Sequence, residues 1–267
     1  MSLFDRIHGC LLGGACGDAL GAPVEFMAHE EIVARYGPCG ITQFDTAYGG
    51  IGLVTDDTQM TLFTVEGLIR DAPFGFFRFD DPSQAFEWAV ESAWTTHGHP
   101  SARYSSGALA AIVAYIAKGK DLSNAISRAL VMLPGDGEAG EVSDALGRAV
   151  DLSRTPDWQK RLPELGKGWV AEEALAISVL CALAGTNARE AIVAAVNHSG
   201  DSDSTGAITG NIVGAINGAN AFPAEWIDRV ELRDVIETLS RDFAAILEER
   251  QDGEGLAQRL WDRYPGW

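Results

Sequence analysis

The stretch NHSGDSDSTGAITGNIVGAINGA, residues 197–219, joins a short acidic run to an apolar segment rich in glycine. Asp201 and Asp203 alternate with hydroxyl side chains up to Thr205, and oxygen donors of this kind are the ligands that hard cations prefer. Beyond this run, glycine recurs at every fourth position, at residues 206, 210, 214 and 218. On a helix, this spacing leaves a stripe without side chains along one face, so a second backbone can approach closely. The stretch therefore predicts a helix over 204–219 with a polar site at its N-terminal end.

A matching glycine series lies near the N-terminus, at residues 9, 13, 17 and 21. Ser2 and Asp5 have the spacing of a capping box, with Asp in place of the usual Glu, and predict a helix that runs to about Leu20. Glycine inside a helix lowers stability by ~1 kcal/mol relative to alanine, so two full series indicate that close contact is required. We expect the two glycine-striped helices to cross at the centre of the fold. This crossing would bring Asp18 and Glu25 towards the acidic run.

A second acidic run, TDDT at residues 55–58, stands directly before a helical pattern over 58–70. One carboxylate there would be explained as a helix cap that also interacts favourably with the helix dipole. Two adjacent carboxylates repel each other unless a positive charge lies between them, which favours metal ligands over capping alone. Together with the acidic run at 201–205, these residues form a candidate binuclear carboxylate site for Mg²⁺ or Mn²⁺.

Composition excludes several classes of function. The formal net charge is −18 over 267 residues, and a strongly acidic protein repels nucleic acid and anionic membrane surfaces. No apolar run reaches the length of a transmembrane helix, and the cysteines lack CxxC spacing, so we expect reduced thiols in the cytoplasm. Helical patterns follow one another, strand signals are nearly absent, and residues 25–54 read as a long loop. We therefore predict an all-α protein, with residues 1–267 in a single compact domain and little or no β-structure.

The histidines show no spacing typical of a zinc site. His97 and His99 lie in the turn THGHP at residues 96–100, and His198 closely precedes Asp201. These three histidines are candidates for substrate contacts. For His97, a role in stabilising its own turn is an alternative that the sequence leaves open.

Five sequence blocks resemble the ADP-ribosylglycohydrolase family. They are GDALGAPVEF (17–26), TDDTQMTLF (55–63), THGHP (96–100), GWVAEEALAI (168–177) and NHSGDSDSTGAITGN (197–211). The blocks occur in family order and span most of the chain. The resemblance implies an orthogonal all-α fold with two bound Mg²⁺ or Mn²⁺ ions. It also implies hydrolysis of the bond between ADP-ribose and its acceptor, and the GDSDST spelling suggests ADP-ribosyl-arginine first.

The resemblance further implies roles for individual residues. One ion would be held by Thr55, Asp56, Asp57 and Asp203, and the other by Asp201, Asp203 and Ser204, with Asp203 bridging. Glu25 would reach in from the loop as a general base or a gate. The residues expected to act in catalysis are Glu25, Asp56, Asp57 and Asp203. The residues expected to bind substrate are Glu25, His97, Gly98, His99, His198 and Gly200.

The sequence departs from the family pattern just before residue 69. In relatives, several dozen residues with a glycine-rich, diphosphate-cradling loop separate the TDDT helix from a motif that residues 69–75 resemble. Here that segment is missing. We expect the chain to act as a cytoplasmic monomer on an ADP-ribosylated protein. The alternatives are a hydrolase of a small ADP-ribose-containing compound and an inactive relative that serves as a binding or structural protein.

Overall fold

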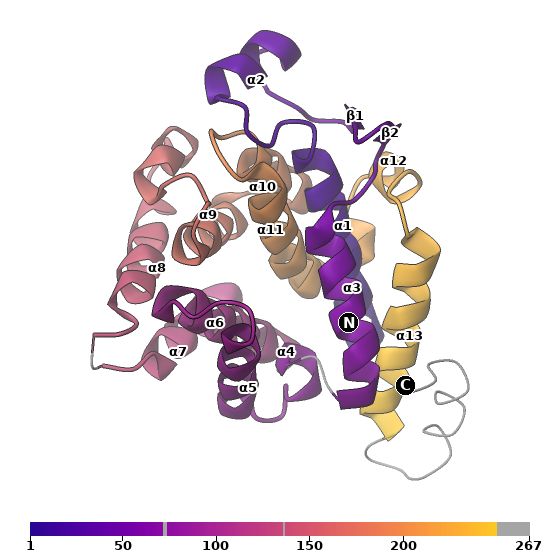
Figure 1. Cartoon of the computed structure of the whole chain (residues 1–267), viewed down its shortest axis with the longest axis vertical. Helices are drawn as coiled ribbons and strands as arrows, with labels where there is room; N and C mark the ends of the chain where they lie inside the picture. The colour runs from indigo at the N-terminus through magenta and orange to yellow at the C-terminus, as the bar shows by residue number, and fades with distance from the viewer. Residues whose placement is uncertain (72–73, 136, 250–267) are drawn as a thin grey trace.

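The computed structural model of this protein describes residues 1–71, 74–135 and 137–249 (Figure 1). The prediction of an all-α fold is confirmed. The α-helices are α1 (Leu3–Gly21), α2 (His29–Tyr36), α3 (Asp56–Asp71), α4 (Phe74–Phe77), α5 (Pro82–Trp94), α6 (Pro100–Ala117), α7 (Leu122–Met132), α8 (Gly140–Leu152), α9 (Ala171–Ala184), α10 (Ala188–Val196), α11 (Ser202–Asn217), α12 (Ala224–Ile227) and α13 (Arg233–Glu249). The remaining elements are the 3₁₀ helices η1 (Trp158–Leu165) and η2 (Ala219–Ala221) and the strands β1 (Thr46–Ala47) and β2 (Gly50–Ile51). No helix within the described residues is long and apolar enough to span a membrane.

Helices α1 and α11 form the closely packed centre of the fold. A Cβ atom on Gly9 would lie 2.3 Å from the Gly214 carbonyl oxygen, and one on Gly17 would lie 2.0 Å from that of Gly206. The glycines at 13 and 210 meet in the same way. The predicted contact between the two glycine series is therefore confirmed. Their order of contact is reversed, with Gly9 against Gly214 and Gly17 against Gly206, so the two helices run antiparallel.

The other helices surround this pair. Helices α13 and α3 lie against α1, while α9 and α10 lie against α11. Helices α4, α5, α6 and α7 form a group below α9, α10 and α11 in the view of Figure 1, and α6 joins this group to α9 and α11. The capping box predicted for α1 is present, with Ser2 accepting from the Asp5 amide and Asp5 accepting from the Ser2 amide. Because α1 and α11 are antiparallel, the C-terminal end of α1 and the N-terminal end of α11 lie together.

The prediction of a long loop over 25–54 is wrong in part. Helix α2 begins after Ala28, with Ile32 as its buried residue. Strands β1 and β2 form a short antiparallel hairpin in which Thr46 pairs with Ile51. Both elements lie above the end of α1 in Figure 1. Their lengths are too short for the periodicity of the sequence to have indicated them.

Candidate metal centre

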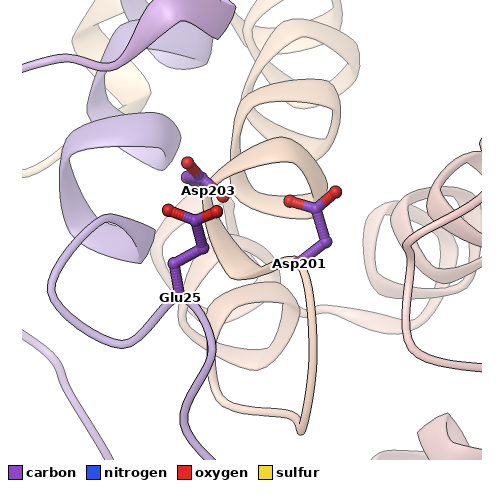
Figure 2. A group of neighbouring side chains, drawn as sticks. All are labelled: Glu25, Asp201 and Asp203. Carbon is purple, nitrogen blue, oxygen red and sulfur yellow. The ribbon is translucent and has the colours of Figure 1, made fainter.

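Three carboxylates converge where α1 ends and α11 begins. Glu25 follows α1, Asp201 is the residue before α11, and Asp203 lies in its first turn. One oxygen from each carboxylate lies within 4.8 Å of the others. Figure 2 shows Glu25 and Asp203 directed towards the same space, with Asp201 beside them. These three residues are therefore brought together as the sequence predicted.

The start of α3 joins this group through one hydrogen bond. The Ser204 hydroxyl donates to Asp57 Oδ2 at 3.0 Å, which links the first turn of α11 to the first turn of α3. Asp57 is half-buried, whereas the side chain of Asp56 is exposed. Thr55 is buried, and its hydroxyl accepts from the Asp57 amide at 3.3 Å. The predicted ligands thus occupy neighbouring helix ends, although their roles stay predictions.

Asp18 has a role that the sequence analysis missed. Its side chain is fully buried and accepts hydrogen bonds from the backbone amides of Thr55 and Thr58 and from the Thr58 hydroxyl. The sequence analysis expected Asp18 to approach the acidic run of α11, and this stays a prediction. Its recorded hydrogen bonds satisfy backbone donors at the N-terminal end of α3, which carry the partial positive charge of the helix dipole. Burial raises the pKa of Asp18, and the hydrogen bonds from the two threonines oppose that shift.

The electrostatics of the site favour a cation. Burial raises the pKa of Asp203 to about 9, with further contributions from its hydrogen bond with Asp201 and from the charges of Glu25 and Asp57. Burial also raises the pKa of Asp57 to about 6, with the charges of Asp18, Asp201 and Asp56 adding to the shift. Within the described part of the chain, no lysine or arginine forms an ion pair with these carboxylates. Crowded carboxylate and hydroxyl oxygens without a basic partner suit a hard divalent ion.

Glu25 is held by contacts that the sequence analysis also missed. The Tyr48 hydroxyl, from the turn between β1 and β2, donates to Glu25 Oε2 at 3.1 Å. The next residue, Phe26, stacks on Trp169 with 5.4 Å between ring centroids. Burial is the main cause of a raised pKa at Glu25, and the Tyr48 hydrogen bond opposes it. Positive φ angles at Phe26 (67°) and Tyr48 (51°) place these contacts in turns that non-glycine residues seldom form, so no simple sequence signal indicated them.

The turn THGHP lies at the start of α6. His97, Gly98 and His99 are exposed. Their recorded hydrogen bonds are local: His97 Nδ1 pairs with the Thr96 hydroxyl, and His99 accepts from the Ser101 amide as the cap of α6. Among the described residues, no hydrogen bond joins this turn to the acidic group. Substrate binding by these three residues stays a prediction, and the local bonds agree with the alternative of a turn-stabilising role.

His198 and Gly200 lie in the segment just before α11 and pack against the first turn of α11 and the loop at Lys167. His198 is 4% exposed, and its Nε2 lies 2.9 Å from the Thr205 hydroxyl oxygen. Burial lowers the pKa of His198, which favours the neutral imidazole. Gly200 has a φ of 142°, and a Cβ on it would lie 2.0 Å from the Lys167 carbonyl oxygen. That carbonyl accepts from the Asp201 amide at 2.9 Å. The geometry gives both residues a structural role, and their predicted substrate contacts stay untested.

The chain is an all-α protein that gathers carboxylate and hydroxyl oxygens after the end of α1 and at the starts of α3 and α11. The fold and the site together define the class of helical proteins with a candidate site for divalent ions. The sequence profile of the ADP-ribosylglycohydrolase family matches residues 1–72 and 67–254. The chain therefore belongs to the ADP-ribosylglycohydrolase family, as its sequence blocks had indicated.

Relatives and solved structures agree with this assignment. The ADP-ribosyl-[dinitrogen reductase] glycohydrolase of Rhodospirillum rubrum is 23% identical over 308 residues, covering 92% of this chain and 97% of that protein. The ADP-ribosylarginine hydrolase Tri1 of Serratia proteamaculans (strain 568) is 25% identical over 176 residues, or 66% of this chain and 45% of that protein. A solved structure described as an ADP-ribosylglycohydrolase-related protein complex shares the fold, with a TM-score of 0.53 and 23% identity over 92% of this chain and 99% of that one.

The comparisons also bear on the missing segment. The family profile matches in two parts that meet at residues 67–72, where the sequence departs from the family pattern. The alignment with the Rhodospirillum rubrum relative runs over 308 residues, more than the 267 of this chain. That relative therefore contains positions without a counterpart here. The motif at 69–75 falls partly outside the described residues, because 72–73 are not among them.

Proposed function

We propose that this protein is a hydrolase that cleaves the glycosidic bond between ADP-ribose and a protein acceptor, with ADP-ribosyl-arginine as the first candidate substrate. The observation that carries the proposal is the convergence of Glu25, Asp201 and Asp203 within 4.8 Å in a member of this family. The names of two relatives, a dinitrogen reductase glycohydrolase and an arginine hydrolase, support the same reaction class.

The site chemistry fits two divalent ions, Mg²⁺ or Mn²⁺. In this proposal the first ion is held by Thr55, Asp56, Asp57 and Asp203, and the second by Asp201, Asp203 and Ser204. All of these residues offer oxygen donors, which hard divalent ions prefer. Ions bound there would supply the Lewis acidity that makes a water molecule a stronger nucleophile and orients ribose hydroxyl groups.

The proton transfer that accompanies bond cleavage is assigned to residues of this chain. The water oxygen forms a bond to the anomeric carbon of the ribose, and the bond from that carbon to the acceptor breaks. In this proposal Glu25 takes the proton of the attacking water, and the raised pKa that burial gives its carboxyl group would make it a stronger base. The departing acceptor nitrogen keeps the electron pair of the broken bond and takes up the proton that Glu25 accepted from the water, while the other water proton stays on the new ribose hydroxyl. Tyr48 orients Glu25 for this transfer through its hydrogen bond.

The direct test is release of ADP-ribose from an arginine-modified protein by the metal-loaded enzyme. We expect turnover that a chelator abolishes, and that Asp57→Ala reduces by at least about 100-fold because the variant lacks a ligand to the first ion. Glu87→Ala, a change of an exposed carboxylate on α5, is the matched control and should keep full activity. Absence of turnover on arginine, serine and other ADP-ribosyl linkages would contradict the proposal.

The break in the family match favours a second candidate. A chain without the diphosphate-cradling segment could serve as a binding or structural protein, or could hydrolyse a small ADP-ribose-containing compound in a more open site. Calorimetry with ADP-ribose and Mg²⁺ separates these candidates. Tight metal binding without nucleotide binding supports the inactive relative, whereas binding of both with turnover of a small compound supports the metabolite hydrolase.

The proposal treats residues 1–267 as one domain that acts as a monomer in the cytoplasm. Gel filtration with light scattering tests the monomer, and a single cooperative unfolding transition would support one domain.

A further inference from the structure

An exposed aromatic stack lies beside the acidic group. The rings of Phe26 and Trp169 are nearly parallel, at 14°, with centroids 5.4 Å apart. Phe26 is nevertheless 73% exposed and Trp169 is 47% exposed. The contact therefore leaves a large aromatic surface facing solvent, which is unusual for two rings that could otherwise bury their faces in a core.

The two rings of the stack come from chain segments that adjoin two different carboxylates of the acidic group, Glu25 and Asp201. Phe26 directly follows Glu25 in the chain. On the other side, Gly168 precedes Trp169 and lies so close to Asp201 that a Cβ on it would be 3.4 Å from the Asp201 Cβ. The aromatic surface thus adjoins the carboxylates that are proposed to act on the anomeric carbon.

The charge around the stack favours a cationic partner. Six carboxylates lie at or directly beneath the site: Asp18, Glu25, Asp56, Asp57, Asp201 and Asp203. Lys167, which is exposed on the same loop as Trp169, supplies one positive charge. Two divalent ions together with Lys167 would still leave the carboxylates in excess. A ring face next to this excess attracts a planar cation through both the ring quadrupole and the carboxylate charge.

This protein already pairs guanidinium groups with aromatic rings elsewhere. The Arg103 guanidinium lies 3.6 Å from the ring centroid of Trp94, and that of Arg241 lies 5.4 Å from the ring of Phe4. Phe4 itself stacks on His8 with geometry close to that of Phe26 and Trp169, at 5.3 Å and 17°. Among the described residues, no arginine lies over the Phe26–Trp169 stack. The Phe26–Trp169 stack therefore resembles the Phe4–His8 stack, except that it has no counterpart of the Arg241 guanidinium over its ring.

We propose that the exposed Phe26–Trp169 stack binds the guanidinium group of an arginine acceptor and so selects for cationic acceptors over neutral ones. The inference rests on the proposed function for the identity of the substrate, but its binding chemistry can be measured separately. The adenine base is a less suitable occupant of this position. The stack adjoins the residues of the reacting bond, and the acceptor is the part of the substrate attached there, whereas adenine lies at the far end of ADP-ribose.

The binding test uses ethylguanidinium and its neutral planar counterpart ethylurea, in the presence of Mg²⁺. The indole N–H signal of Trp169, assigned with Trp169→Phe, reports on the stack. We expect a saturable shift with millimolar ethylguanidinium and none with ethylurea. Equal effects of the two compounds, no effect of either, or a shift caused only by adenosine would overturn the inference.

The kinetic test compares an ADP-ribosyl-arginine substrate with an ADP-ribosyl-serine peptide. Trp169→Ala should raise KM for the arginine substrate about fivefold with little change in kcat, because an exposed cation–aromatic contact is of that size. KM for the serine peptide should not change, and Trp169→Phe should restore much of the affinity. Phe4→Ala removes the similar stack on His8 and is the matched control for loss of an aromatic ring.

Failures of the two proposals can be told apart. Ethylguanidinium binding in a protein that hydrolyses no ADP-ribosyl linkage would overturn the proposed function and leave this inference standing. Normal turnover with an unchanged KM for arginine substrates in Trp169→Ala would overturn this inference and leave the function standing.

Discussion

The two acidic helix starts differ in how the fold holds them. At the start of α11, Asp203 is 5% exposed, and the helix behind it is locked to α1 through paired glycines. At the start of α3, Asp56 is exposed, and the outer face of the helix includes Met60 and Phe63, which are 55% and 71% exposed. Backbone packing therefore fixes one half of the site. The other half lies on α3, which packs against α1 and α13 and whose first turn is held by the buried side chain of Asp18.

This contrast indicates a division between a rigid half and an adjustable half. Asp203 lies where the backbones of α1 and α11 are in contact near Gly21, whereas the structure joins Asp57 to α11 through the Ser204 hydrogen bond. Preorganised ligands on a rigid element lower the cost of binding a metal ion. Three experiments test the contrast, beginning with the largest expected effect.

Substitution of Gly17 by alanine should force α1 and α11 apart and so disturb the rigid half of the site. The new Cβ would lie 2.0 Å from the Gly206 carbonyl oxygen, and backbone atoms cannot move aside by changing rotamer. We expect a loss of about 3 kcal/mol or more in the free energy of unfolding, measured by urea denaturation. The control is Gly147→Ala on α8, where a Cβ meets no atom within 4 Å and should stabilise the protein by ~1 kcal/mol. Equal effects of the two substitutions would contradict close packing of α1 and α11.

Substitution of Asp18 by asparagine should loosen the adjustable half. Asparagine keeps the shape but loses the charge, and its NH2 group cannot accept hydrogen bonds, so only one neutral carbonyl oxygen remains to accept from the Thr55 and Thr58 amides. The expected loss is about 2 kcal/mol, because hydrogen bonds to a charged acceptor are lost. Amide hydrogen exchange should rise at Thr55 and Thr58 but stay unchanged at Thr205. Asp121→Asn is the control, since Asp121 caps the exposed start of α7 and asparagine is an equally good cap.

The pH dependence of stability should distinguish the two halves in the metal-free protein. Folding raises the pKa of Asp203 to about 9 and of Asp57 to about 6, from a usual value of 3.8. Between pH 3.8 and the folded-state pKa of each group, the folded state holds a proton that the unfolded state has released. The free energy of unfolding therefore falls as pH rises through that range. The loss attributed to Asp57 ends near pH 6. Between pH 6 and pH 8 we expect Asp203 to account for a further loss of about 3 kcal/mol in the free energy of unfolding.

Thermal melts in a chelator, followed by melts in Mn²⁺, measure this effect. Asp203→Asn should be more stable than the metal-free wild type at pH 8 and should lose most of the stabilisation by Mn²⁺. A flat profile from pH 6 to pH 8 in the wild type would show that Asp203 is ionised without a metal.

The sequence predicted the parts of the fold that are marked by a regular spacing of residues or by a helix-capping motif. The glycine series of α1 and α11 and the Ser2–Asp5 capping box are local patterns with a direct physical reading, and all were found. The antiparallel direction of the pair was not predicted, because side-chain spacing on a helix does not define the polarity of its partner.

The supporting residues of the site were harder to predict. The sequence analysis did not predict the hydrogen bonds of Asp18 to the amides of Thr55 and Thr58, which lie 37 and 40 residues further along the chain. The contacts of Tyr48 and Phe26 arise from left-handed turns within a hairpin and a loop. Such contacts depend on how distant segments meet, and single-sequence patterns carry little information on that.

The glycine pairing also has a consequence for the order of events during folding. The Asn211 side-chain amide donates to the Cys10 carbonyl across 201 residues of chain, and Arg6 donates to the Ala215 carbonyl across 209. During synthesis, α1 leaves the ribosome long before its partner exists, and contacts of such long range form slowly. Until α11 has been synthesised, the face of α1 that packs against it has no partner. The end of α1 and the start of α11, which carry predicted metal ligands, therefore come together only after residues 202–217 have been made.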